Sequence, residues 1–196
     1  RETETAVPLN GGLLLALVIG LPWMLLLLWG APVIFSVLVD DAGVSELGTG
    51  YFQARLLAVI AVGSNFAFRG YWNGVNLSRL YMRTLLVMHA CNIFLNWALI
   101  FGNAGFPELG TTGAGLGTAI STWIGTVYYI AQAWGRARGN GFLSAIPSAE
   151  TLRTMLRVAL PAGIQQFLFA TGMTIFFWIV GQVGTRELAA SNVLLN

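Results

Sequence analysis

The sequence predicts an all-α fold: a polytopic transmembrane helix bundle with five full membrane helices and the start of a sixth. Of its 196 residues, 56% are hydrophobic and 9% are charged, whereas about a quarter of the residues in a soluble domain are charged. The apolar residues gather in blocks of about 20, the length that crosses a bilayer. All ten basic residues are arginines that lie between these blocks, which indicates membrane topology and argues against nucleic-acid binding.

The first three predicted membrane helices differ in their polar content. The helix over residues 11–39 carries no charge and has two internal prolines as possible kink sites. The helix over 51–73 contains Arg55, expected near the outer interface, and Arg69, expected near the cytoplasmic one. Both arginines are expected to extend their guanidinium groups to the membrane surface. The third helix, over 80–101, is apolar except for a few polar side chains.

The remaining predicted membrane helices follow a run of small residues. The helix over 112–134 carries small residues four positions apart from Gly113 to Gly125, which is typical of close helix packing in lipid. The fifth helix covers 158–183, and a sixth is expected to begin near Glu187. The chain lacks an N-terminal Met and a signal-peptide pattern, and we expect it to be an internal fragment of a longer protein.

The long connection between the fourth and fifth helices predicts a boundary between two bundles. Residues 1–134 would form the remainder of an N-terminal bundle, 135–157 a cytoplasmic linker, and 158–196 the start of a C-terminal bundle. Within the linker, Ser148 is a plausible N-cap for a short amphipathic surface helix that ends before Pro161; an ordinary loop is the alternative.

The arginines predict the orientation of the chain. With five alternating crossings, eight of the ten arginines lie on one side, and the opposite side holds five acidic residues. The positive-inside rule places the arginine-rich side in the cytoplasm. We therefore expect a multi-pass membrane protein with this orientation.

Three polar residues of the third helix are the first candidates for a functional site. His89, Asn92 and Asn96 follow an i, i+3, i+7 spacing, which places them within about 60° on one helix face. They could form hydrogen bonds between helices. Alternatively, they could line a water-filled cavity, bind a coupling cation, or, in the case of His89, carry a proton.

Other polar residues in the apolar segments are further candidates for a cavity lining. They lie on the second and fifth helices: Asn65, Gln165, Gln166, Thr171 and Thr174. The chain has a single histidine, a single cysteine, Cys91, and no carboxylate inside the predicted membrane helices. These residues do not supply a catalytic triad or a metal-ligand cluster, so the sequence does not indicate an enzyme, and a metal site is unknown.

Several stretches together resemble the multidrug and toxic compound extrusion (MATE) transporters. "YFQARLLAVIAVGSNFAFRGYWNG" is similar to the family's fourth helix, and "NIFLNWALIFG" with "FPELGTTGAGLGTAIS" to its fifth and sixth helices. "LPAGIQQFLFATG" and "VGQVGTRELAASNVLLN" are similar to the seventh helix and the start of the eighth. The resemblance covers nearly the whole chain, which would span the third to seventh helices of a two-bundle, twelve-helix transporter.

The resemblance implies a secondary active transporter, a cation-coupled antiporter that exports small amphipathic or cationic compounds by alternating access. It implies Na⁺ or H⁺ as the coupling ion and no other cofactor. It also implies a full-length protein that functions as a monomer in the lipid bilayer of the plasma membrane, the bacterial inner membrane. The chain departs from the family at two positions. Asn96 stands where many members have Asp, and Phe169 where many have Glu.

Two alternative functions stay open from the sequence. A flippase for lipid-linked oligosaccharides, from the same superfamily, is expected to place cationic residues inside its cavity, and the sequence indicates none at mid-membrane. A non-transporting membrane scaffold or sensor would not need the polar residues of the third helix. The substrate itself is not predicted.

Overall fold

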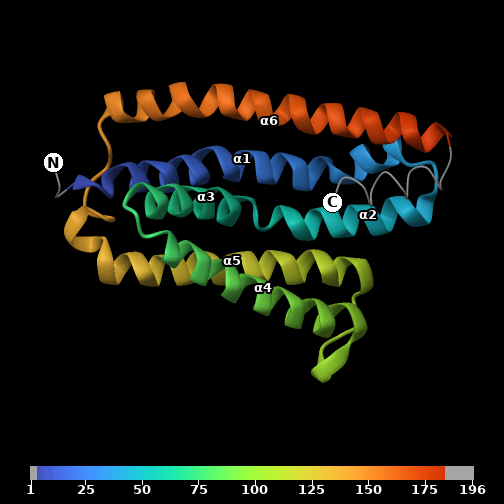
Figure 1. Ribbon diagram of the computed structural model, residues 1–196. Coiled ribbons are helices and arrows are strands. Elements are labelled where there is room, and N and C mark those ends of the chain that lie inside the picture. The colour runs from blue at the N-terminus through green and yellow to red at the C-terminus, as the bar shows by residue number, and fades with distance from the viewer. Residues whose placement is uncertain (1–3, 184–196) are drawn as a thin grey trace. The chain divides into compact units, whose positions relative to one another are not determined.

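The computed structural model describes residues 4–183, and all regular elements in this range are helices (Figure 1). The predicted all-α fold is confirmed. The chain divides into two compact units, Arg1–Pro147 and Ser148–Asn196, called unit 1 and unit 2 below. The helices are α1 Val7–Leu38, α2 Ala42–Leu56, α3 Val59–Gly74, α4 Ser78–Phe101, α5 Gly110–Arg136 and α6 Ala149–Val183, with short 3-10 turns η2 Asn103–Gly105 and η3 Arg138–Asn140.

Three of the described helices are long and apolar enough to cross a membrane. They are α1, α4 and the Ala149–Phe177 part of α6, and the bent pair of α2 and α3 makes a fourth if it is one span. The 27 residues of α5 are long enough to cross a membrane. Its many Gly, Thr and Ser residues make it less apolar than these helices, and it is not among the candidate spans. The count of five membrane helices therefore stays a prediction, and the expected start of a sixth near Glu187 lies outside the described residues.

Close contacts align α1 with the α2–α3 pair along most of its length. A methyl group at Gly12 would be 2.7 Å from the Ala67 side chain, so the two backbones approach closely there. Further along α1, Gln53 Nε2 donates a hydrogen bond of 3.0 Å to the Leu28 carbonyl. Both predicted kink sites, Pro22 and Pro32, lie within one continuous helix.

The second predicted helix, over 51–73, is not a single straight helix. It begins earlier, as α2, where the Asp41 side chain accepts a hydrogen bond from Val44 N at 2.9 Å and caps the helix. It then breaks between α2 and α3 with a bend of 45°. No proline or glycine occupies the break. Instead, Trp123 Nε1 of α5 donates a hydrogen bond of 2.9 Å to the carbonyl of Leu57, a backbone acceptor at the break.

The expectation of a separate amphipathic helix before Pro161 is wrong. α6 runs without interruption from Ala149 to Val183, with Pro161 inside it. The predicted N-cap is confirmed, because Thr151 N donates a hydrogen bond of 3.2 Å to Ser148 Oγ. Large apolar side chains of α6 such as Phe167 and Leu168 are exposed, which is the character of a helix that meets lipid or another apolar surface.

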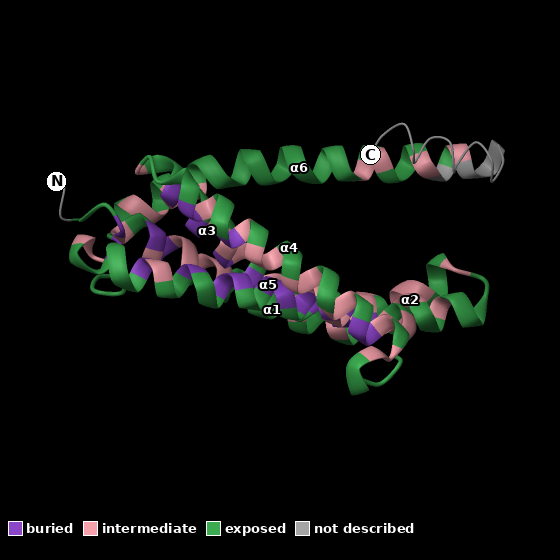
Figure 2. Ribbon diagram, turned by 60° about the horizontal axis from the view of Figure 1, so that its bottom comes forward, coloured by how far each residue is buried: buried purple, intermediate pink, exposed green. Residues whose placement is uncertain are grey.

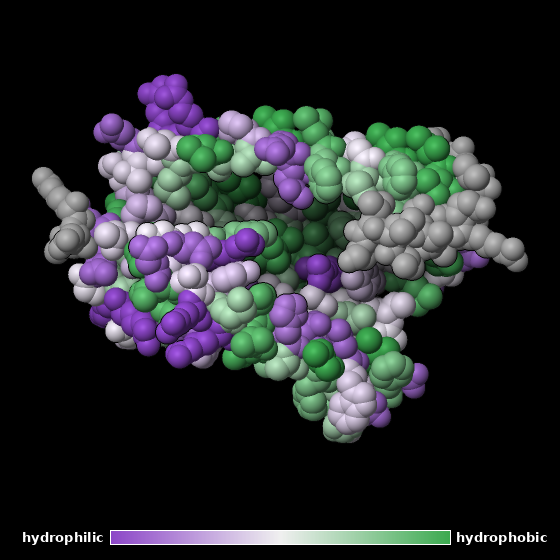
Figure 3. Space-filling model, in the orientation of Figure 1, coloured by the Kyte–Doolittle hydropathy of each residue, from purple (hydrophilic) through white to green (hydrophobic). Residues whose placement is uncertain are grey.

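The packed core of unit 1 lies at the end of the bundle that holds its arginine-rich connections. Phe68 of α3 stacks on Tyr129 of α5 with ring centroids 5.1 Å apart, and Phe142 packs beside Phe68. Buried residues also follow the faces where α3 and α5 meet their neighbours (Figure 2). Hydrophilic residues gather at this end, on the left of Figure 3. The Arg69 guanidinium there lies over the Tyr81 ring, 5.2 Å from its centre.

Candidate functional site

The α4–α5 interface brings two of the predicted site residues into a narrow contact. Asn92 and Asn96 are one helical turn apart on α4 and are half-buried against α5. The opposing residues of α5 are small, so the two backbones approach closely. A methyl group at Gly117 would be 2.5 Å from Asn96 Oδ1 and 3.3 Å from the Asn96 backbone nitrogen. The small residues therefore leave room for amide side chains between the helices.

The two asparagines form one hydrogen-bonded cluster with hydroxyl groups of α5. Asn96 Nδ2 donates to Asn92 Oδ1 at 3.2 Å. Asn92 Nδ2 in turn donates to Thr118 Oγ1 at 3.2 Å and to Ser121 Oγ at 3.3 Å. Both hydroxyls also donate to carbonyl oxygens of their own helix. We call Asn92, Asn96, Thr118 and Ser121 the amide–hydroxyl cluster.

One oxygen of the amide–hydroxyl cluster has no partner. Asn96 Oδ1 is buried and accepts no hydrogen bond from the residues that the structure describes. An unsatisfied buried acceptor is costly, and in native proteins such groups usually have an ion or a water molecule as partner. The cluster therefore presents neutral oxygen atoms, with one acceptor free, which is a suitable environment for a hard cation or an ordered water molecule.

Asn65, the candidate on α3, forms a second polar contact with α5. Asn65 Nδ2 donates to the Thr122 carbonyl at 3.2 Å, and Thr126 Oγ1 donates to Asn65 Oδ1 at 2.9 Å. Asn65 also lines a pocket of about 250 Å³ that extends to Arg69 and Tyr81. Asn65 thus bonds between helices and also lies in the wall of this pocket, and its assignment to a transport cavity stays a prediction.

His89 is not part of the amide–hydroxyl cluster. Its side chain is exposed, whereas Met88, its neighbour in sequence, lies against Gly125 of α5. Among residues 4–183, no group of three or more His, Cys, Asp or Glu side chains could hold a metal ion. The structure therefore separates the predicted stripe into a bonded asparagine pair and an exposed histidine.

The candidates of α6 belong to unit 2 and are described by themselves. Gln165 and Gln166 are exposed, and Thr171 is half-buried. The Thr174 hydroxyl donates to the Ala170 carbonyl at 2.9 Å within the same helix. Their assignment to a cavity lining stays a prediction.

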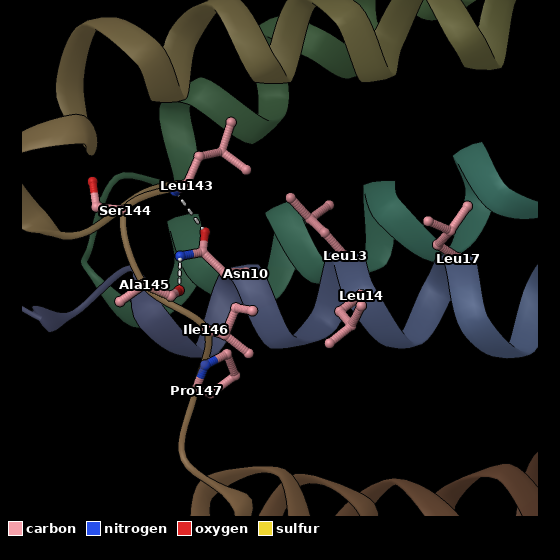
Figure 4. A pocket seen from close by; sticks show the side chains of 9 residues that line it. All are labelled: Asn10, Leu13, Leu14, Leu17, Leu143, Ser144, Ala145, Ile146 and Pro147. Carbon is pink, nitrogen blue, oxygen red and sulfur yellow. Dashed lines mark hydrogen bonds between the residues drawn. The ribbon is translucent and has the colours of Figure 1, made fainter.

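The structure also shows a polar residue that the sequence analysis did not single out. Asn10, near the start of α1, donates from Nδ2 to the Gly141 and Ala145 carbonyls, both at 2.8 Å, and accepts from Leu143 N at 2.9 Å (Figure 4). It thus fixes the segment after α5 to α1. Leucines of α1 and the segment up to Pro147 line an adjoining pocket of about 380 Å³. An asparagine at the edge of an apolar block was the only sequence signal.

Comparisons with known proteins agree with one another. The MatE family model matches residues 1–98, half of the chain. The multidrug resistance protein NorM of Vibrio cholerae is 28% identical over 200 aligned residues, which cover 100% of this chain and 44% of that protein. A probable multidrug resistance protein NorM of Thermotoga maritima is 30% identical over 149 residues, or 74% of this chain and 32% of that protein.

A solved structure shares the fold. The crystal structure of MATE in complex with MaD3S superposes with a TM-score of 0.75 at 18% identity, over 96% of this chain and 46% of that one. At this identity the likeness concerns the fold. The chain thus spans less than half the length of these relatives.

Proposed function

We infer that this chain, which belongs to the MatE family, is part of a secondary active transporter that exports small amphipathic or cationic compounds in exchange for Na⁺ or H⁺. The relatives over the whole chain are named as multidrug resistance proteins, which supports a transporter and not an enzyme. We expect the full-length protein to work as a monomer in the bacterial inner membrane, with bundles that rock to alternate access.

The observation that carries this proposal is the amide–hydroxyl cluster between α4 and α5. Polar side chains at membrane depth are costly, and they often line ion or substrate pathways. Here the cluster includes an unpartnered buried oxygen, Asn96 Oδ1. A cluster that served only to hold two helices together would be expected to satisfy its own acceptors.

The cluster would have to bind a cation without a local negative charge. Between Glu46 and Glu108 the sequence contains no acidic residue, and none lies within α5. The available ligands are therefore the amide oxygens of Asn92 and Asn96 and the hydroxyl oxygens of Thr118 and Ser121. Neutral oxygens suit Na⁺ better than they suit H⁺, because they do not take up a proton near neutral pH.

The experiment measures efflux by the full-length protein in proteoliposomes under separately imposed Na⁺ and H⁺ gradients. We expect the Na⁺ gradient to drive export and Asn96→Ala to raise the Na⁺ concentration for half-maximal rate. Asn96→Asp restores a carboxylate and should lower that concentration below the wild-type value. Asn73→Ala, at an exposed position on α3, is the matched control. It should change neither the export driven by Na⁺ nor the Na⁺ concentration for half-maximal rate.

Two results would contradict the proposal in different ways. If neither gradient drives efflux, the antiporter mechanism is wrong. If export is driven by Na⁺ but both Asn96 variants lower only the thermal stability, the cluster is structural and the coupling site lies elsewhere. His89→Gln tests the proton alternative, since an unchanged pH profile of transport excludes His89 as the proton carrier.

A further inference from the structure

One side chain of α1 fastens the segment that leads from unit 1 to unit 2. Residues 143–147 are the last of unit 1, and α6 begins at Ala149. Asn10 Nδ2 donates a hydrogen bond to the Ala145 carbonyl at 2.8 Å, and Leu143 N donates to Asn10 Oδ1 at 2.9 Å (Figure 4). We call residues 143–147 the strap.

The strap follows residues that are firmly fixed in unit 1. Phe142, directly before it, is 2% exposed and packs beside Phe68 in the core. Gly141 is held as well, because its carbonyl accepts a hydrogen bond of 2.8 Å from Asn10 Nδ2. Asn10 is therefore bonded to the fixed part of the chain through Gly141 and to the strap through its two other hydrogen bonds.

Other contacts contribute little to holding the strap in place. One of its side chains, that of Pro147, is buried, and the four others are exposed. The bonds of Ser144 go to nearby carbonyls, those of Gly141 and Phe142. Segments with few buried apolar contacts open more readily than the rest of a fold. The two hydrogen bonds from the strap to Asn10 are thus its main long-range attachment to α1.

The fastened strap holds Leu143 in a strained backbone conformation. Its φ is 54°, in the left-handed region that is unfavourable for a residue with a Cβ atom. The Leu143 side chain is exposed, so its packing does not offset this strain. The strain at Leu143 and the hydrogen bonds to Asn10 oppose each other, which brings the fastened and released states of the strap closer in free energy.

We propose that the strap is released from Asn10 and fastened again in each transport cycle. The proposal rests on the proposed export function, in which bundles rock to alternate access. While the strap is fastened, a single residue, Ser148, separates it from α6. Five released residues can span up to about 17 Å, so release lengthens the connection that a rocking motion requires.

Hydrogen–deuterium exchange of the full-length protein in lipid nanodiscs measures release of the strap directly. The exchange rates of residues 143–147 are corrected for the intrinsic rate of each sequence. Leu143→Gly relieves the left-handed strain, whereas Leu143→Ala, its matched control, removes the exposed side chain and keeps the strain. We expect exchange in Leu143→Gly to be at least about twofold slower than in Leu143→Ala, since the freedom of glycine in the released strap offsets part of the gain.

A second pair of variants tests the attachment to α1. Asn10→Ala removes both hydrogen bonds to the strap and should speed its exchange by at least about tenfold. Asn73→Ala, at an exposed position on α3, is the matched control and should leave the exchange rate of the strap unchanged.

Transport in proteoliposomes under an imposed Na⁺ or H⁺ gradient links release of the strap to the cycle. The kcat of Leu143→Gly should fall to about half that of Leu143→Ala or less, with KM unchanged, because release becomes rarer and substrate binding is not altered. In the Asn10→Ala background the same two variants should have equal kcat, since the strap is then already released. A purely structural role of Leu143 would not make its effect depend on Asn10.

Each contrary result has a defined meaning. Equal exchange rates in Leu143→Gly and Leu143→Ala, or an unchanged rate in Asn10→Ala, overturn the proposal because strain and Asn10 then do not control the strap. Different exchange rates with equal kcat also overturn it, because the strap then stays fastened during transport. Absence of wild-type export under either gradient refutes the proposed function and the link to transport, whereas the exchange rates still decide whether the strap is released.

Discussion

Substitution of Gly113 by alanine tests whether α5 packs on α4 as closely as the structure indicates. A methyl group at Gly113 would meet the carbonyl oxygen of Leu99 and lie 2.7 Å from the carbonyl carbon. These are backbone atoms, so a change of rotamer cannot relieve the overlap, and α4 and α5 must move apart. Overpacking of this kind typically costs about 1–3 kcal/mol.

The same substitution also makes the helix intrinsically more stable, and a control must remove that contribution. Alanine is favoured over glycine in a helix by about 1 kcal/mol. Gly135, near the end of the same helix, has no heavy atom within 4 Å of an added methyl group. The difference between Gly113→Ala and Gly135→Ala therefore isolates the overpacking cost. Gly125→Ala should fall between them, because its obstacle is the flexible side chain of Met88.

The assay is thermal unfolding of the detergent-solubilised full-length protein. We expect Gly113→Ala to melt at a lower temperature than Gly135→Ala. The difference should be a few degrees at most, since 1 kcal/mol corresponds to about 2–4 °C for 150–250 residues and to less for a longer protein. Equal melting temperatures for the two variants would refute the close approach of α4 and α5. A ranking with Gly125→Ala as the least stable of the three would refute the reasoning about backbone and side-chain obstacles.

Two other contacts give predictions of the same form. Trp123→Phe removes the hydrogen bond to the Leu57 carbonyl and should lower the free energy of unfolding by about 1 kcal/mol. The control is Trp97→Phe, at a tryptophan that is exposed to a similar degree, which should have less effect. Equal effects of the two variants in thermal unfolding would contradict the prediction. Asn10→Ala removes all three hydrogen bonds to the segment after α5 and should speed limited proteolysis within residues 141–147. Asn73→Ala is the control and should leave the cleavage rate unchanged. An unchanged rate in Asn10→Ala would show that Asn10 does not hold this segment.

The sequence predicted the bounds of a helix best where a continuous apolar segment alone determines them. The third predicted helix, over 80–101, differs from α4 by two residues at its start. The break between α2 and α3 was missed because neither proline nor glycine marks it. The break involves a hydrogen bond from Trp123, a residue far away in sequence. Conversely, Pro161 suggested a helix end that does not occur, because proline in a helix interior removes one hydrogen bond without always ending the helix.

The spacing of polar residues predicted half of the candidate site. Asn92 and Asn96 do share a face and bond to each other, and Asn92 makes the interhelical hydrogen bonds that the sequence left open. His89 lies at the edge of the same face, and there Met88 occupies the contact with α5 instead. Spacing on one helix cannot show where the neighbouring helix crosses it. The bonding partners on α5 were likewise hidden within a run of residues that reads as simple packing.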